Sequence, residues 1–90
     1  MAGPDARPAI AAGFRLQWEA AQNAHVLLYP EGMIKLNASA GEILKRCDGA
    51  ATIGAITADL ERAFATPGLS ADVMKFVDLA VEKKWLVIGP

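Results

Sequence analysis

One histidine and one cysteine are the side chains with the greatest catalytic potential in this 90-residue chain. His25 lies in a short apolar run with no serine or cysteine nucleophile beside it, so a neutral histidine packed in or beside the core is the simplest interpretation. Cys47 falls on the apolar side of a predicted helix, where a free cysteine behaves as a small hydrophobic residue. One cysteine and one histidine are too few to hold a metal ion. A small enzyme that uses His25 or Cys47 is therefore an alternative without further support.

The acidic and glycine residues form no catalytic or phosphate-binding motif. The ten Asp and Glu residues are scattered along the chain. Glu42 is placed to cap a helix, and Asp59 and Glu61 fall on a solvated helix face, so they do not form an acid–base pair. The glycines between residues 41 and 54 match neither common phosphate-binding loop. We therefore expect a protein that is not an enzyme.

The charge balance argues against binding to nucleic acid. Nine Lys and Arg residues are matched by ten Asp and Glu residues, for a net charge of −1. A DNA-binding domain needs a basic stripe because neutralising phosphates supplies much of its affinity. The predicted helix over residues 71–84 carries as many acids as lysines. A winged-helix DNA-binding regulator is kept as the alternative function. Because the charge is balanced, however, we expect no nucleic-acid partner.

The sequence predicts neither a membrane-spanning segment nor an export signal. No apolar run approaches the roughly 20 residues of a membrane-spanning helix, and the first residues lack a basic cluster followed by a bulky apolar run. A single cysteine cannot form an internal disulfide, which fits a reducing compartment. We expect a cytoplasmic domain with no membrane partner.

Three strands are predicted in the first part of the chain. Apolar and polar residues alternate over Phe14–Glu19, the period of a strand with one buried face. His25–Tyr29 and Met33–Leu36 flank Pro30–Gly32, whose Pro and Gly favour a tight turn. The sequence therefore predicts a β-hairpin whose last strand, Met33–Leu36, forms an open edge of the sheet.

Three helices follow, each with a recognisable start. Asn37, Thr52 and Ser70 are the predicted N-caps, and Ser39 with Glu42 offers a competing capping box one turn further into the first helix. The apolar stripes of the three helices are Ala40, Ile43, Leu44 and Cys47; Ile53, Ile56, Leu60 and Phe64; and Val73, Phe76, Val77, Ala80 and Val81. Trp85–Ile88 ends the chain as a short strand or apolar tail. The predicted fold is α+β and winged-helix-like, a three-stranded antiparallel sheet followed by a three-helix cluster. We expect residues 1–13 to be a flexible leader and residues 14–90 to form the domain.

Two sequence motifs resemble those of a known family. Residues 36–44 read LNASAGEIL and continue to Cys47-Asp48-Gly49, and residues 29–32 read YPEG. Both are similar to the PqqD family of pyrroloquinoline quinone biosynthesis, and Trp18 and Trp85 fall where that family has aromatic residues. The resemblance covers about residues 14–87.

The resemblance implies a non-catalytic module that recognises a peptide. PqqD-family domains bind the precursor peptide PqqA and present it to PqqE, a radical-SAM enzyme, and they hold no cofactor. Related domains bind a leader peptide as an added strand, beside a groove formed by the third helix. This implies a peptide-binding edge at Met33, Ile34, Lys35 and Leu36 and a groove wall at Val73, Phe76, Val77 and Ala80. An open edge also favours pairing with a second copy of the chain, so we expect a weak homodimer.

Overall fold

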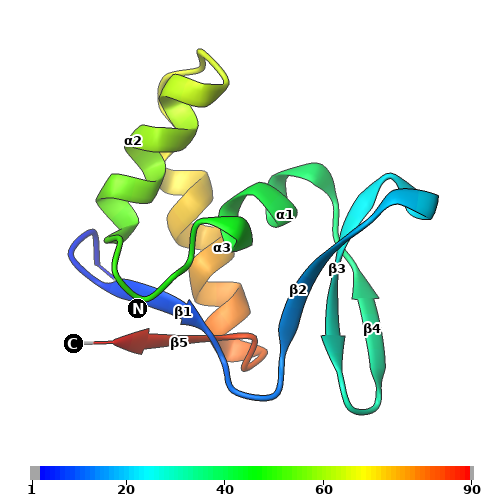
Figure 1. Ribbon diagram of the computed structural model, residues 1–90. Helices are drawn as coiled ribbons and strands as arrows, with labels where there is room; N and C mark the ends of the chain where they lie inside the picture. The colour runs from blue at the N-terminus through cyan, green and yellow to red at the C-terminus, as the bar shows by residue number, and fades with distance from the viewer. Residues whose placement is uncertain (1–2, 90) are drawn as a thin grey trace.

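A three-stranded sheet and three helices form the body of the molecule, with a two-stranded sheet beside them (Figure 1). The structure is a computed structural model that describes residues 3–89. Its elements are β1 (Arg7–Ile10), β2 (Arg15–Glu19), β3 (Ala24–Tyr29), β4 (Gly32–Lys35), α1 (Ala38–Lys45), α2 (Ile53–Ala63), α3 (Ser70–Glu82) and β5 (Leu86–Gly89), with a short 3-10 turn at Ala20–Gln22. The larger sheet has the antiparallel order β2-β3-β4, and β1 pairs with β5. The predicted α+β, winged-helix-like fold is confirmed.

The central strand β3 joins the sheet to the helices. Leu16 of β2, Leu27 of β3 and Ile34 of β4 are direct cross-strand partners, so their side chains share one face. This face points towards the helices, because α1 packs on β3 and Leu27 is completely buried in the common core. The predicted hairpin of β3 and β4 is also confirmed, with Tyr29 paired with Gly32 at its tip.

The first two helices begin where the sequence predicts. The Asn37 side chain accepts a hydrogen bond from the Ala40 N–H at 2.7 Å, and the Thr52 hydroxyl accepts one from the Ala55 N–H at 3.1 Å. Each bond satisfies an N–H that lacks an intrahelical partner. The apolar stripes then meet in one core with the sheet. The buried members of the helical stripes are Ala40, Ile43, Leu44, Cys47, Ile53, Ile56, Leu60, Val73, Val77 and Ala80.

The start of α3 differs from the prediction. Ser70 is its first residue and does not cap it; Leu69 precedes the helix and has no capping side chain of its own. The Leu69 N–H instead donates to the Glu61 carboxylate at 2.9 Å. Glu61 of α2 thus holds the backbone N–H of the residue before α3, which is a different donor from the first-turn N–H groups that a Ser70 cap would satisfy.

The expected flexible leader is wrong for most of its length. Arg7–Ile10 forms β1, paired with β5 at the other end of the chain. The carbonyls of Pro4 and Pro8 accept hydrogen bonds from the N–H groups of Gly54 and Gly49, both at 2.9 Å. A proline lacks an N–H but keeps its carbonyl, so prolines are compatible with a segment attached through its acceptors. The domain therefore extends beyond the predicted start at residue 14, while residues 1–2 lie outside the described part.

Two apolar side chains that the sequence pattern assigned to the interior are at the surface. Trp18 is 52% exposed and packs edge-on against His25, with ring centroids 5.0 Å apart. Phe64 is 53% exposed because α2 ends at Ala63, one residue before it. Simple periodicity placed both residues on buried faces, but Trp18 is the last residue but one of β2 and Phe64 follows directly after α2.

Candidate functional site

The outer edge of β4 presents backbone hydrogen-bonding groups without a partner strand. Within residues 3–89, β4 pairs only with β3. The Leu36 N–H donates to the His25 carbonyl at 3.0 Å, which makes these two residues a hydrogen-bonded pair. Since such pairs alternate along an antiparallel ladder, Ile34 is bonded to Leu27, whereas the N–H and C=O groups of Met33 and Lys35 point away from β3.

The four predicted edge residues differ in accessibility. Met33 is 50% exposed and Lys35 is also exposed. Ile34 is partly buried against the core, and Leu36 is buried. A ligand at this edge would therefore meet the side chains of Met33 and Lys35 on one face and the rim of the core at Ile34 on the other. Leu36 supports the strand from inside.

The four predicted residues of α3 do not form a surface groove beside this edge. Val73, Val77 and Ala80 are at most 2% exposed and fill the core. Only Phe76 keeps a partly accessible side chain. The helix packs against α2 and β5, and Figure 1 shows β4 at the far side of the sheet from α3. Val77 and Ala80 therefore offer no surface to a ligand, and Val73 reaches only the base of a hollow between the helices, on the side of α3 that faces α1 and α2.

A second open edge, which the sequence reasoning missed, lies at β2. Within the described residues β2 pairs only with β3, and the same alternation directs the backbone groups of Leu16 and Trp18 outwards. Three consecutive antiparallel strands leave the first and the last as edges unless another strand pairs with one of them, and here β1 and β5 pair with each other. That topological rule was the signal that could have identified β2.

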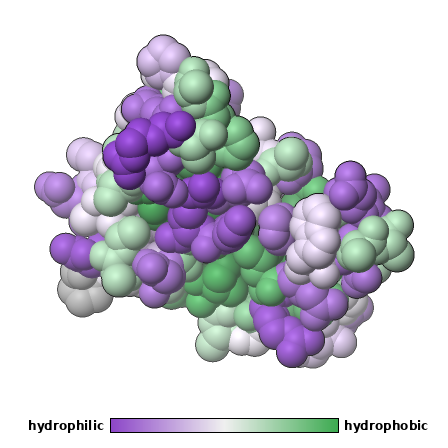
Figure 2. Space-filling model, turned by 45° about the horizontal axis from the view of Figure 1, so that its top comes forward, coloured by the Kyte–Doolittle hydropathy of each residue, from purple (hydrophilic) through white to green (hydrophobic). Residues whose placement is uncertain are grey.

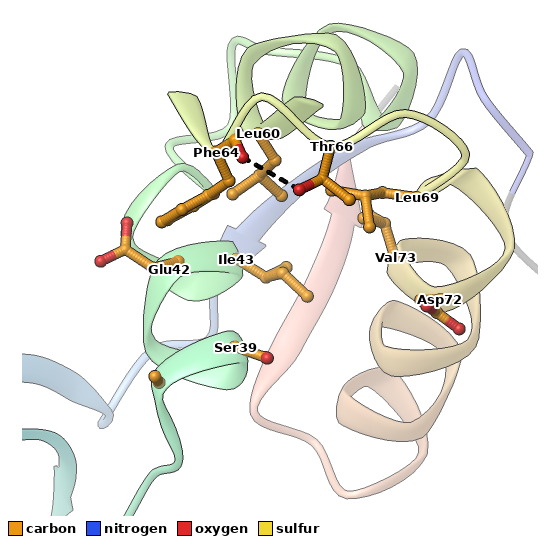
Figure 3. A pocket seen from close by; sticks show the side chains of 10 residues that line it. Ser39, Glu42, Ile43, Leu60, Phe64, Thr66, Leu69, Asp72 and Val73 are labelled. Carbon is orange, nitrogen blue, oxygen red and sulfur yellow. Dashed lines mark hydrogen bonds between the residues drawn. The ribbon is translucent and has the colours of Figure 1, made fainter. Parts of the chain in front are cut away.

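The helices enclose a hollow that the sequence did not predict. Its volume is about 330 Å³, and Figure 3 shows side chains from α1, the end of α2, the following loop and the start of α3 around it. The lining residues are Ala38, Ser39, Glu42, Ile43, Leu60, Phe64, Thr66, Leu69, Asp72 and Val73. Most of the lining is apolar, as in small ligand sites. These residues are spread over three elements, so no local motif reveals the site.

The residues with catalytic potential are in structural positions. Burial raises the pKa of the Cys47 thiol to about 12, and this thiol donates to the Ile43 carbonyl at 3.2 Å. A thiol held in its protonated form is a poor nucleophile. His25 is covered by Trp18 on one side and lies next to Gly41 on the other. In the part of the chain that is described, no three His, Cys, Asp or Glu side chains converge as metal ligands would.

Several large apolar side chains are exposed on the surface. They are Trp18, Met33, Phe64, Leu79, Val87 and Ile88. Figure 2 shows a hydrophobic patch near the middle of the face that it presents, bordered by hydrophilic residues. Exposed apolar surface rimmed by polar residues is typical of binding sites.

No helix within residues 3–89 has the length and apolar character needed to cross a bilayer.

These features define a small winged-helix-like binding domain whose sheet has open edges. The sequence profile of the family described as "Coenzyme PQQ synthesis protein D (PqqD)" matches residues 24–86. The chain therefore belongs to the PqqD family.

Similar proteins agree with this assignment. The chain is 52% identical over 80 residues to the "PqqA binding protein" of Stutzerimonas stutzeri (strain A1501), which covers 88% of this chain and 87% of that protein. It is 51% identical, with the same coverage, to the protein of that name from Azotobacter vinelandii (strain DJ / ATCC BAA-1303).

A solved structure shares the fold. It is the solution NMR structure of the PqqD truncation of Methylobacterium extorquens PqqCD, described as a functional, stand-alone recognition element for ribosomally synthesized and post-translationally modified peptides. The TM-score is 0.80 at 28% identity, over 97% of this chain and 95% of that one.

Proposed function

We propose that this chain binds the precursor peptide PqqA as an additional strand along β4 and presents it to the radical-SAM enzyme PqqE, without catalysing a reaction itself. The relatives named PqqA binding proteins and the related recognition element support a role in peptide binding. The resemblance noted in the sequence is the source of the PqqE assignment.

The observation that carries the proposal is the orientation of the β4 backbone. Met33 and Lys35 direct their N–H and C=O groups towards the open edge. An extended peptide can pair with these groups whatever its sequence, because only main-chain atoms take part. Side chains on alternate residues of the peptide then provide selectivity.

The two faces of the edge favour different side chains in the peptide. On the face of Met33 and Lys35, an acidic peptide residue opposite Lys35 gains a charge-assisted contact. On the opposite face, an apolar residue beside Ile34 extends the rim of the core. The edge therefore fits an extended segment in which an acidic residue and apolar residues lie on opposite sides.

Strand addition orders a flexible peptide at a considerable entropic cost. Fixing one backbone residue costs about 1–2 kcal/mol, whereas a hydrogen bond contributes a net of only about 0.5–1.5 kcal/mol. Burial of apolar side chains must offset the difference, at about 25 cal/mol per Å². If the same chain contacts PqqE, the bound peptide is held near the enzyme at a high effective concentration.

The surface charge of α3 gives no support to the DNA-binding alternative. Its exposed positions include Asp72, Lys75 and Glu82, which alternate in sign rather than forming a basic stripe.

Self-pairing of two copies of the chain at β4 stays a prediction. If a weak dimer forms through this edge, added PqqA competes with it, and sedimentation shows dimer converting into a 1:1 complex.

The test of the proposal is calorimetric titration of PqqA into the Lys35→Pro variant. Proline removes the outward N–H of Lys35 and leaves the bonds between β3 and β4 intact, whereas Ile34→Pro would break that internal ladder. We expect the affinity for PqqA to fall about tenfold or more, the equivalent of about 1.4 kcal/mol.

Two variants separate the competing causes of such a loss. Lys35→Ala removes the charge but keeps the N–H, so it should reduce affinity less than Lys35→Pro. Leu16→Pro removes an outward N–H from the other edge, β2, and should leave the affinity for PqqA unchanged. Unchanged affinity in folded Lys35→Pro, or a larger loss in Leu16→Pro, would refute pairing at β4.

A further inference from the structure

The hollow between the three helices has the properties of a second binding site. Ile43 of α1 and Leu60 of α2 form its base with Val73 of α3, and all three side chains belong to the core. Phe64 and the partly buried Leu69 stand above them at the rim (Figure 3). At about 330 Å³ the hollow lies at the small end of the range for ligand sites. It is therefore large enough for a single bulky side chain.

The position of Phe64 is not explained by the core. Its side chain is 53% exposed, although it continues the apolar stripe of α2. The chain leaves the helix directly after it, and the Thr66 hydroxyl donates to the Phe64 carbonyl at 2.9 Å, a bond that holds the turn beside the ring. An aromatic side chain left half in water at the mouth of an apolar hollow gains contacts when a ligand covers it.

The charged residues that line the hollow are both acidic. Glu42 of α1 and Asp72 of α3 lie on opposite sides, and no Lys or Arg lines it. Arg46 pairs with Glu42 at 2.8 Å from outside the lining and offsets much of its charge, so the negative charge at the rim comes mainly from Asp72. A ligand that brings an apolar group into the hollow and positive charge to its rim therefore matches both the shape and the charge of the site.

We propose that this hollow binds a large apolar side chain of a protein partner, flanked in the partner's chain by Lys or Arg. The site is formed by the helices, whereas β4 is the outer strand of the sheet (Figure 1). It does not depend on strand addition at β4. If both proposals hold, one chain binds an extended peptide and a protein partner at the same time.

Two short peptides of opposite charge test the proposal. N-acetyl-Lys-Trp-Lys-amide and N-acetyl-Glu-Trp-Glu-amide are titrated separately into the 15N-labelled full chain, and amide shifts are recorded by NMR. We expect the basic probe to bind several-fold more tightly and to shift amides in residues 38–43 and 60–73. Equal affinity for the two probes, no shifts, or shifts confined to β4 would overturn the proposal.

Matched variants assign the binding to the hollow. Phe64→Ala should weaken binding of the basic probe about tenfold, and Asp72→Asn should reduce the preference for the basic probe over the acidic one. Leu79→Ala is the control, because Leu79 is 44% exposed on α3 and does not line the hollow. An equal loss in Leu79→Ala would contradict the assignment.

Two further measurements separate this proposal from peptide binding at β4 and from dimer formation through the hollow. Affinity of Phe64→Ala for PqqA should equal that of the unsubstituted chain, so failure at the hollow and failure at β4 give different patterns. Sedimentation of the chain alone tests a second copy as the occupant. A dimer that Phe64→Ala abolishes would show that the hollow binds another copy, and the proposed partner would be wrong.

Discussion

Gly41 in α1 lies so close to His25 in β3 that a Cβ atom on Gly41 would be only 2.7 Å from the His25 Nδ1. The absence of a side chain at this position lets α1 sit directly on the central strand. Only Leu36 and Asn37 separate β4 from α1, so the position of α1 on β3 constrains where the edge strand ends. The geometry of the candidate site thus depends on a helix–strand contact on the interior face.

Gly41→Ala should destabilise the fold. The methyl group must displace the His25 ring or move α1, and overpacking of this kind costs about 1–3 kcal/mol. Urea unfolding followed by circular dichroism measures the loss. In the double variant with His25→Ala, the space left by the imidazole should accept the new methyl, so the two effects should not add. Strict additivity would show that the two side chains do not compete for space.

Ala65→Gly should stabilise the chain. Ala65 has φ +50°, the left-handed conformation that follows many helices and that glycine adopts most easily. The Ala65 and Thr66 N–H groups donate to the carbonyls of Arg62 and Glu61, as in the usual glycine-terminated helix end. We expect a gain of about 0.5–1 kcal/mol in unfolding free energy. A loss of stability would show that the alanine side chain makes contacts that outweigh the backbone strain.

Local signals in the sequence were enough to predict most of the fold. The Pro-Glu-Gly turn before Met33 fixes a hairpin, and Asn37 and Thr52 cap their helices through bonds to residues three positions later. Long-range pairing left no such signal. β1 pairs with β5 at the opposite end of the chain. Its Pro8 has no N–H and so argues against a strand in the sequence, but in the structure the Pro8 carbonyl accepts a hydrogen bond from the Gly49 N–H.

The candidate site could be predicted only in part. The edge at Met33 and Lys35 follows from the order of the strands, because the last strand of a hairpin lies at the edge unless something covers it. The direction of each backbone group depends on the ladder register, which the sequence does not specify. The exposure of Phe64 could not be predicted either, since it follows from where α2 ends and not from its periodicity.

Cys47 should be unreactive in the folded chain at pH 8. Burial raises the pKa of its thiol from 9.0 to about 12, so the protonated form persists well above neutrality. Below pH 9 the thiol is protonated in both the folded and the unfolded chain, so it does not change how the free energy of unfolding depends on pH. Between pH 9 and about 12 the unfolded chain loses this proton first, so unfolding free energy falls by up to about 1.4 kcal/mol per pH unit. Iodoacetamide labelling and alkaline urea titrations measure the two effects.

Cys47→Ser is the control for the alkaline loss. Its hydroxyl does not ionise in this range, so the fall that remains in the variant comes from other groups. Equal pH profiles above pH 9 for both chains would contradict burial of the thiol. Rapid labelling under native conditions would do the same.

Arg46→Gln should weaken the fold at neutral pH and much less in acid. Arg46 hydrogen-bonds the carboxylates of Glu42 in α1 and Asp59 in α2, and these bonds lower the pKa of both acids. A lowered pKa stabilises the folded chain above the ordinary range near pH 4, and this contribution is lost as pH falls through the lowered values.

The expected cost of losing the Arg46–Glu42 pair is about 0.5–1 kcal/mol at pH 7. Unfolding midpoints at pH 7 and pH 3 compare the variant with the unsubstituted chain. A difference that persists unchanged at pH 3 would show that Arg46 acts through packing and not through its ion pairs.

The most direct test of peptide binding at β4 is NMR of the complex between labelled protein and unlabelled PqqA, which records contacts between protons of the two chains. We predict contacts from the PqqA backbone to Met33, Ile34 and Lys35, in the pattern of one added strand. Backbone contacts to Leu16 and Trp18 of β2 in their place, or to the helices alone, would contradict it.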